Sequence, residues 1–152
     1  MSTATQERRY WWQGALMTIK ASGAQTGGAL GLVEAEFPGD FGPPQHVHSR
    51  EDEAFYVLEG EIRFRRGDEE VVGRPGDWVY GPRGVPHSFK TGTDGARALV
   101  LVMPGGFEEM FADGGVAAAQ SDAPPPPAPY DPEAAAALAR KYGFEFVGPP
   151  EG

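Results

Sequence analysis

The chain has 152 residues with 22 glycines and 15 prolines, a composition that suits one domain of short strands separated by turns. Its formal net charge of −9 argues against a nucleic-acid partner, because 22 acidic residues outnumber the 13 Lys and Arg that could neutralise phosphates. The absence of cysteine excludes disulfides, thiolate metal ligands and cysteine nucleophiles. The polar start lacks the apolar segment of a secretory signal, and no apolar run approaches the ~18 residues of a membrane span. We therefore expect a cytoplasmic protein without a membrane partner.

The turn signals divide the chain into short strands. In chain order, strands are predicted at 15–22, 29–37 and 54–60, a hairpin at 61–73 around Gly67-Asp68, and further strands within 75–82, 86–91 and 96–103. A short helix is expected within 105–115. Seven or eight strands at this spacing predict an all-β fold, a sandwich or a barrel.

The C-terminal part differs in composition. Residues 121–130 are proline-rich and predict an extended linker. Asp131 as the cap, Pro132 in the first helical position and Gly143 after the end predict a helix over 132–142. Residues 144–150 then form an edge strand or pack over the barrel mouth. The expected organisation is a flexible segment at 1–9, a barrel at 10–120, the linker at 121–130, and a helix and tail at 131–152.

Two histidines stand one residue apart at the start of the central strands. On a strand His46 and His48 point to the same face, so both imidazoles can reach one metal ion. A turn at 49–52 resets the phase and places Glu53 on an inward face with Phe55. A carboxylate on an apolar face needs a cation or another partner, which favours Glu53 over Glu51 as the inward group.

The third histidine of the chain, His87, follows a loop stiffened by two glycines and two prolines. Any one of the three histidines alone would be interpreted as a surface or core residue. Together with a correctly phased glutamate, in a chain with no other histidine, they predict one metal site.

These residues carry a resemblance to the cupin superfamily. The first cupin motif, G-x5-H-x-H-x3-4-E-x6-G, is matched by His46, His48, Glu53 and Gly60, with its leading glycine displaced to Gly39 or Gly42. The second motif, G-x5-P-x-G-x2-H-x3-N, is matched by Gly76, Pro82, Gly84 and His87, with Thr91 in place of the asparagine.

The resemblance implies a single jelly-roll β-barrel that holds one divalent metal through His46, His48, Glu53 and His87. Three imidazoles and a carboxylate suit Fe, Ni, Co, Mn or Zn and do not choose among them. Such a ligand set leaves positions open, as in catalytic sites.

The expected substrate pocket is aromatic. Its candidate lining is Phe41, Phe55, Trp78, Tyr80 and Phe89, although small barrels also fill their cores with such side chains. No group of Arg or Lys shares the histidine face, which disfavours a polyanionic substrate and favours a neutral, planar small molecule.

The layout resembles the small bacterial cupins grouped with quercetin 2,3-dioxygenase. In that group the metal holds a deprotonated flavonol, the ligand glutamate takes the hydroxyl proton, and O2 opens the heterocycle with release of carbon monoxide. Carried to this chain, Glu53 is both ligand and base, and O2 is a second substrate. One alternative is a cyclase, isomerase or lyase in which the metal polarises a carbonyl and Glu53 or Tyr80 moves a proton. Another is a binding protein without catalysis.

Two further expectations concern the surroundings of the site. Residues 103–115, with glycines at both ends, are a candidate lid or a helix packed permanently on the barrel rim. The strand at 15–22 is a candidate edge for a homodimer, by resemblance to paired cupins.

Overall fold

The structure is a computed structural model that describes residues 8–118 and 123–150. Predictions for residues 1–7, for 119–122 of the linker region and for the last two residues lie outside this part of the chain. The elements, in chain order, are β1 (Arg8–Trp12), β2 (Ala15–Ala21), β3 (Gly31–Phe37), β4 (Pro44–His48), β5 (Asp52–Arg66), β6 (Glu69–Gly73), β7 (Trp78–Gly81), β8 (His87–Met103), α1 (Glu109–Gly114), β9 (Val116–Ala117), α2 (Pro132–Tyr142) and β10 (Phe144–Pro150).

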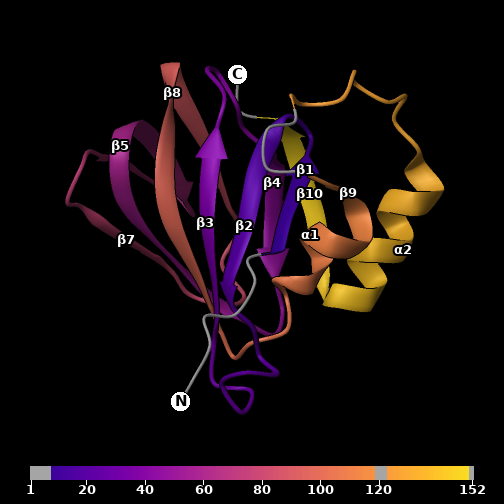
Figure 1. The fold of residues 1–152 in the computed structure, drawn as a ribbon. Helices are drawn as coiled ribbons and strands as arrows, with labels where there is room; N and C mark the ends of the chain where they lie inside the picture. The colour runs from indigo at the N-terminus through magenta and orange to yellow at the C-terminus, as the bar shows by residue number, and fades with distance from the viewer. Residues whose placement is uncertain (1–7, 119–122, 151–152) are drawn as a thin grey trace, which may run out of the picture.

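Within the described residues, the strands form one curled antiparallel sheet (Figure 1). Strand β8 is its centre, because it pairs with β3, β4 and β5. The predicted all-β fold with a C-terminal helix is confirmed. No helix in the described part of the chain is long and apolar enough to cross a membrane.

Two predicted strand breaks are wrong. Strand β5 continues through Gly60, where the pairing with β8 shifts register and the backbone takes a φ of 79°. A glycine there accommodates a bulge, so the strand bends and goes on instead of turning back. Strand β8 likewise joins the two strands expected at 86–91 and 96–103 into one.

The N-terminal edge of the sheet also differs from the prediction. Arg8 and Arg9 belong to β1, which pairs with β2 on the side opposite β3. Strand β2 is therefore an interior strand and offers no free edge for the homodimer contact expected at 15–22.

The C-terminal helix forms where its capping signals predict it. The Asp131 carboxylate accepts hydrogen bonds from the backbone N–H groups of Glu133 and Ala134 at 3.0 and 3.2 Å, and Gly143 ends the helix with a φ of 71°. Helices α1 and α2 lie side by side on one side of the sheet (Figure 1). Strand β10 then returns to pair with β4, which confirms the edge-strand alternative for 144–150.

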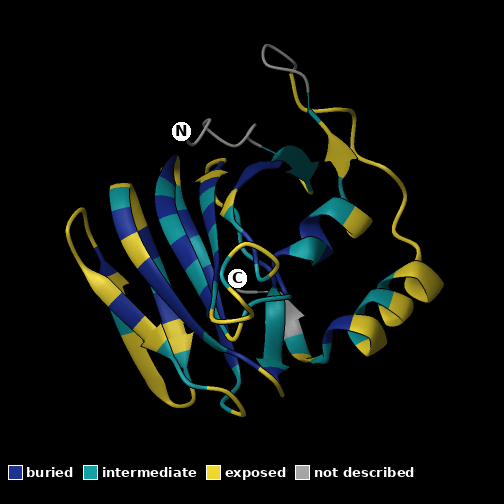
Figure 2. Cartoon of the chain, turned by 60° about the horizontal axis from the view of Figure 1, so that its bottom comes forward, coloured by how far each residue is buried: buried dark blue, intermediate teal, exposed yellow. Residues whose placement is uncertain are grey.

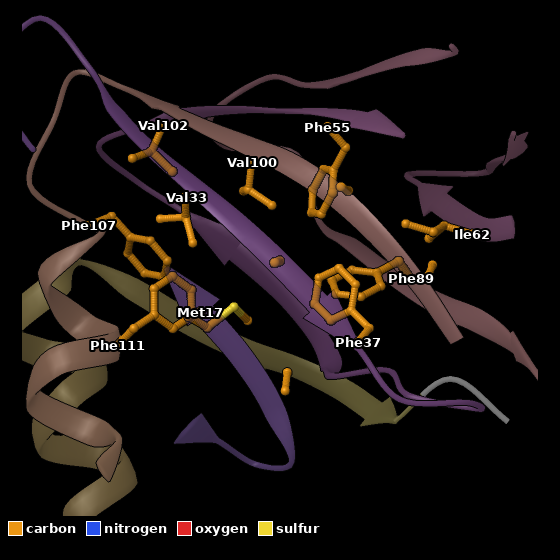
Figure 3. Packing of buried hydrophobic residues seen from close by; sticks show 14 of the residues in the cluster. Met17, Val33, Phe37, Phe55, Ile62, Phe89, Val100, Val102, Phe107 and Phe111 are labelled. Atoms are coloured by element: carbon orange, nitrogen blue, oxygen red, sulfur yellow. The ribbon is translucent and has the colours of Figure 1, made fainter. Parts of the chain in front are cut away.

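Figure 2 marks the buried residues along the strands, and Figure 3 shows that many of them are aromatic side chains packed inside the sheet. At one end, the rings of Phe37, Phe55 and Phe89 lie with centroids about 5 Å apart. At the other end, Phe107 lies in the turn before α1 and Phe111 lies in α1, and their rings pack over the strands. The core is therefore completed by residues outside the central strands.

The bulge in β5 gives a test of the fold. At Gly60 an added Cβ would lie 2.3 Å from the carbonyl oxygen of Gly95, whereas at Gly76, with a φ of 93°, it would meet nothing within 4 Å. Gly76→Ala should cost only the left-handed backbone, about 1–2 kcal/mol. Gly60→Ala adds a clash with backbone and should lower the free energy of unfolding by about 3 kcal/mol or more. Urea denaturation measures both, and equal losses would contradict the predicted clash.

Candidate metal centre

Three neighbouring strands bring together the four predicted ligands. His46 and His48 lie on β4, Glu53 on β5 and His87 at the start of β8, where it pairs with His46. One ligand atom from each of the four lies within 4.8 Å of the others. The β4–β8 pairing places His46 opposite His87, whereas Glu53 pairs with Gly81 of β7 and with Val102 at the far end of β8. The curl of the sheet therefore brings the four ligands together on one inner face.

Backbone carbonyls orient two of the three imidazoles. His46 Nδ1 lies 2.9 Å from the carbonyl oxygen of Pro44, and His87 Nδ1 lies 3.1 Å from that of Val85. A carbonyl accepts a proton and cannot donate one, so the Nδ1 nitrogens carry the hydrogens. This tautomer leaves each Nε2 lone pair free for a cation.

Glu53 lies between two of the histidines. Its carboxylate oxygens are 3.4 Å from His87 Nε2 and 3.6 Å from His48 Nε2, and the residue is 6% exposed. Burial opposes ionisation of this carboxyl, but its close contact with His87 and the other nearby imidazoles outweighs burial and lowers its pKa to about 2. Glu53 is therefore an anionic ligand at neutral pH.

Burial favours the neutral imidazole, the form that binds a metal, in His46 and His48. Burial lowers the pKa of His46 to about 4 and also lowers the pKa of His48. For His87, burial acts in the same direction, but the carboxylate of Glu53, 3.4 Å away, overcomes it and raises the pKa. A cation bound to Glu53 would compete directly with a proton on His87.

Unpaired buried nitrogens indicate that the site fits a metal ion. His48 Nδ1, His48 Nε2 and His87 Nε2 are buried and have no hydrogen-bond partner. Buried polar atoms normally have partners, and leaving one without costs about 1–3 kcal/mol. A divalent metal would satisfy the two Nε2 atoms, and three nitrogens with one carboxylate are a donor set for transition metals.

A mainly apolar cavity of about 60 Å³ lies against this group. It is bordered by His46, His48 and Glu53 and otherwise by apolar or aromatic side chains: Trp12, Met17, Phe37, Pro43, Phe55, Phe89, Val100, Phe107, Met110 and Phe111. Phe107 also packs edge-on against His48, with ring centroids 4.6 Å apart. A ligand in this cavity would have an apolar body and one end at the histidines.

The predicted pocket residues divide into two groups. Phe55 and Phe89 line the cavity, and Phe41 packs behind the lining, stacked on Phe37. The placement of Trp78 and Tyr80 in this cavity is wrong, because Val79 faces inward and its neighbours on β7 face outward, 53% and 38% exposed.

Tyr80 lies instead beside a second, smaller cavity of about 20 Å³, on the side of Glu53 that faces Arg66 and Ser88. A hydrogen bond to Asp52 raises the pKa of its phenol. Tyr80 is therefore held as a neutral phenol outside the aromatic cavity.

The sequence pattern missed a second buried acid. Glu51 is 5% exposed, although only Glu53 was expected inside, and its Oε1 lies 3.8 Å from His48 Nδ1. Burial raises the pKa of Glu51 to about 7. No local pattern could have signalled this, because the turn at 49–52 is positioned by residues about 90 positions away.

Comparison with known proteins agrees with this fold and site. A family described as "Cupin domain" matches residues 34–104. Among solved structures, an RmlC-like cupin from Shewanella frigidimarina is 21% identical, with a TM-score of 0.58 over 68% of this chain and 89% of that one. A protein described as a predicted oxalate decarboxylase from Thermotoga maritima is 19% identical, with a TM-score of 0.58 over 68% of this chain and 98% of that one. The cupin-domain match thus covers a little under half of the chain, and the fold of the chain is similar to that of these solved structures.

Among curated proteins, the chain resembles quercetin 2,3-dioxygenases. It is 29% identical over 96 residues to quercetin 2,3-dioxygenase of Bacillus subtilis and 28% identical over 103 residues to that of Aspergillus japonicus. Each match covers 63% of this chain but only 28% and 29% of the relatives. The chain thus spans less than a third of the length of the curated relatives it matches.

The ligand set can be tested by metal content. His87→Ala removes one of the four donors and Glu53→Gln removes the negative charge of another, so each should lower bound metal severely in this buried site. Glu61→Gln is the matched control, since Glu61 lies on the same strand with its side chain exposed. Elemental analysis of protein purified without chelator measures the ratio of metal to chain. Full metal content in both ligand variants would contradict this assignment.

Proposed function

We propose that the protein is a metal-dependent cupin enzyme, a dioxygenase that acts on a flavonol-like or other planar aromatic small molecule. The observation that carries this proposal is the arrangement of His46, His48 and Glu53 along one wall of a cavity whose remaining lining is apolar or aromatic. The similarity to two quercetin 2,3-dioxygenases supports the same class of substrate.

The bound metal would be held by His46, His48, Glu53 and His87, and would supply a Lewis acid that lowers the pKa of a substrate hydroxyl and an electron carrier for reaction with O2. Glu53 borders the cavity, so it lies within reach of a substrate hydroxyl there and would accept its proton once the metal has lowered the pKa of that hydroxyl. The aromatic side chains orient a planar ring and exclude water from the site.

The lining also separates substrate classes. No Lys or Arg is among the residues bordering this cavity in the described part of the chain. A dicarboxylate or phosphorylated substrate would leave a charge in an apolar cavity without a counter-ion, at a high cost in free energy. A neutral molecule with one acidic hydroxyl needs only the ligand group as its polar contact.

The size of the cavity requires movement for a large substrate. Pockets for drug-sized ligands measure about 300–1,000 Å³, whereas this cavity is about 60 Å³. Phe107, Met110 and Phe111 from the segment at 103–115 border it, and that segment is tied down at its surface by an ion pair between Arg8 and Glu109 at 2.7 Å. We infer that this segment acts as the lid and opens when a flavonol-sized molecule enters.

Oxygen uptake tests the proposed reaction. Protein reconstituted separately with Fe, Ni, Co or Mn should consume O2 when given a flavonol, with carbon monoxide released, and the His87→Ala variant should not. Consumption of the flavonol without O2 uptake would favour the cyclase, isomerase or lyase alternative. Binding of the flavonol without turnover by any metal form would favour a binding protein.

A further inference from the structure

Among the Nδ1 atoms of the three histidines, that of His48 is the one without a hydrogen bond to a backbone carbonyl. His48 is 1% exposed, and its Nδ1 has no hydrogen-bond partner. In His46 and His87 the same atom faces the carbonyl oxygen of the residue two positions earlier. Nothing of that kind fixes the tautomer of His48.

The atom facing His48 Nδ1 belongs to Glu51. The Oε1 atom of this carboxylate lies 3.8 Å from Nδ1, is itself buried and also lacks a hydrogen-bond partner. Two buried polar atoms of complementary type therefore face each other at a distance that a small rotation of either side chain would close to hydrogen-bond length.

The turn that carries Glu51 is fixed from both sides. Ser49 donates two hydrogen bonds to the carbonyl oxygen of Gly143 at 2.9 Å, from its backbone N–H and from its hydroxyl. On the other side, Asp52 accepts from the backbone N–H of Arg83 at 2.9 Å and pairs with its guanidinium at 3.3 Å. Glu51, between these anchors, is directed inward.

We propose that Glu51 is a positioning residue whose carboxylate accepts a hydrogen bond from His48 Nδ1–H and so prepares His48 as a metal ligand. This inference rests on the proposed metal site. A proton held on Nδ1 leaves the lone pair on Nε2, and Nε2 lies on the side of Glu53, 3.6 Å from its Oε2. A carboxylate behind a ligating imidazole also makes that imidazole a stronger donor.

The test compares three variants in the full chain. Glu51→Ala removes the acceptor, Glu51→Gln keeps an acceptor oxygen without the charge, and Glu61→Gln is the control, since Glu61 is an exposed acid on β5 that pairs with Arg74. The dissociation constant for Co²⁺ is measured by competition with a chelator. We expect it to rise roughly 10- to 100-fold in Glu51→Ala, less in Glu51→Gln, and not in Glu61→Gln.

Two further readouts separate positioning from a general structural role. In Zn²⁺-loaded, ¹⁵N-labelled protein, the Nδ1–H resonance of His48 should shift in Glu51→Gln and stay in place in Glu61→Gln. Urea unfolding of the metal-free variants should show no loss of stability in Glu51→Gln, because the amide fills the same space and keeps an oxygen that can accept from His48 Nδ1–H. Weakened metal binding would then be separate from misfolding.

The outcomes distinguish this inference from the site on which it rests. Wild-type affinity for Co²⁺ in all three variants, with an unmoved His48 resonance, would overturn the role of Glu51 and leave the metal site intact. Failure of the wild-type chain itself to bind Co²⁺, Zn²⁺ or any other divalent metal tested would overturn both.

Discussion

The pairing of β8 with both β4 and β5 is the constraint on which the site depends. His46 and His87 face each other across the β4–β8 ladder. Glu53, on β5, pairs with Val102 near the far end of β8 and with Gly81 of β7, so the curl of the sheet brings it back to His87. A shift of one residue in either ladder would turn the ligand side chains away from the interior, because alternate residues of a strand face opposite sides. The long strand β8, continuous past Gly92 and Gly95, therefore fixes the site and the fold together.

The interior of the sheet contains both an apolar aromatic core and a group of polar metal-ligand side chains. The aromatic core favours dehydration, while the ligand group places a carboxylate and several unpaired imidazole nitrogens in the same space. Such an arrangement is costly in an empty protein and becomes favourable with a cation, since the cation satisfies the same atoms that water would otherwise satisfy. The apolar lining then selects for ligands that bring one polar end to the metal and an apolar body to the rings.

Local spacing was sufficient to predict much of the fold and the ligand group. The two-residue period of a strand places His46 and His48 together, and the capping signals around α2 depend only on neighbouring residues. The burial of Glu51 was not predictable in this way, because the 49–52 turn is held by Gly143. The prediction that Trp78 and Tyr80 point inward was also wrong. In this short strand, aromatic residues flank a valine, so both faces are apolar and the sequence does not show which face is buried. Distant contacts decide these features.

The most direct test of a metal-dependent cupin is the stoichiometry and ligand environment of a metal added to stripped protein. One equivalent of Co²⁺ or Fe²⁺ should bind per chain, and X-ray absorption should show scattering from three imidazoles together with oxygen donors. Binding of no metal, or of a metal whose environment lacks three imidazoles, would contradict the account, because the chain has only the three histidines assigned to the site.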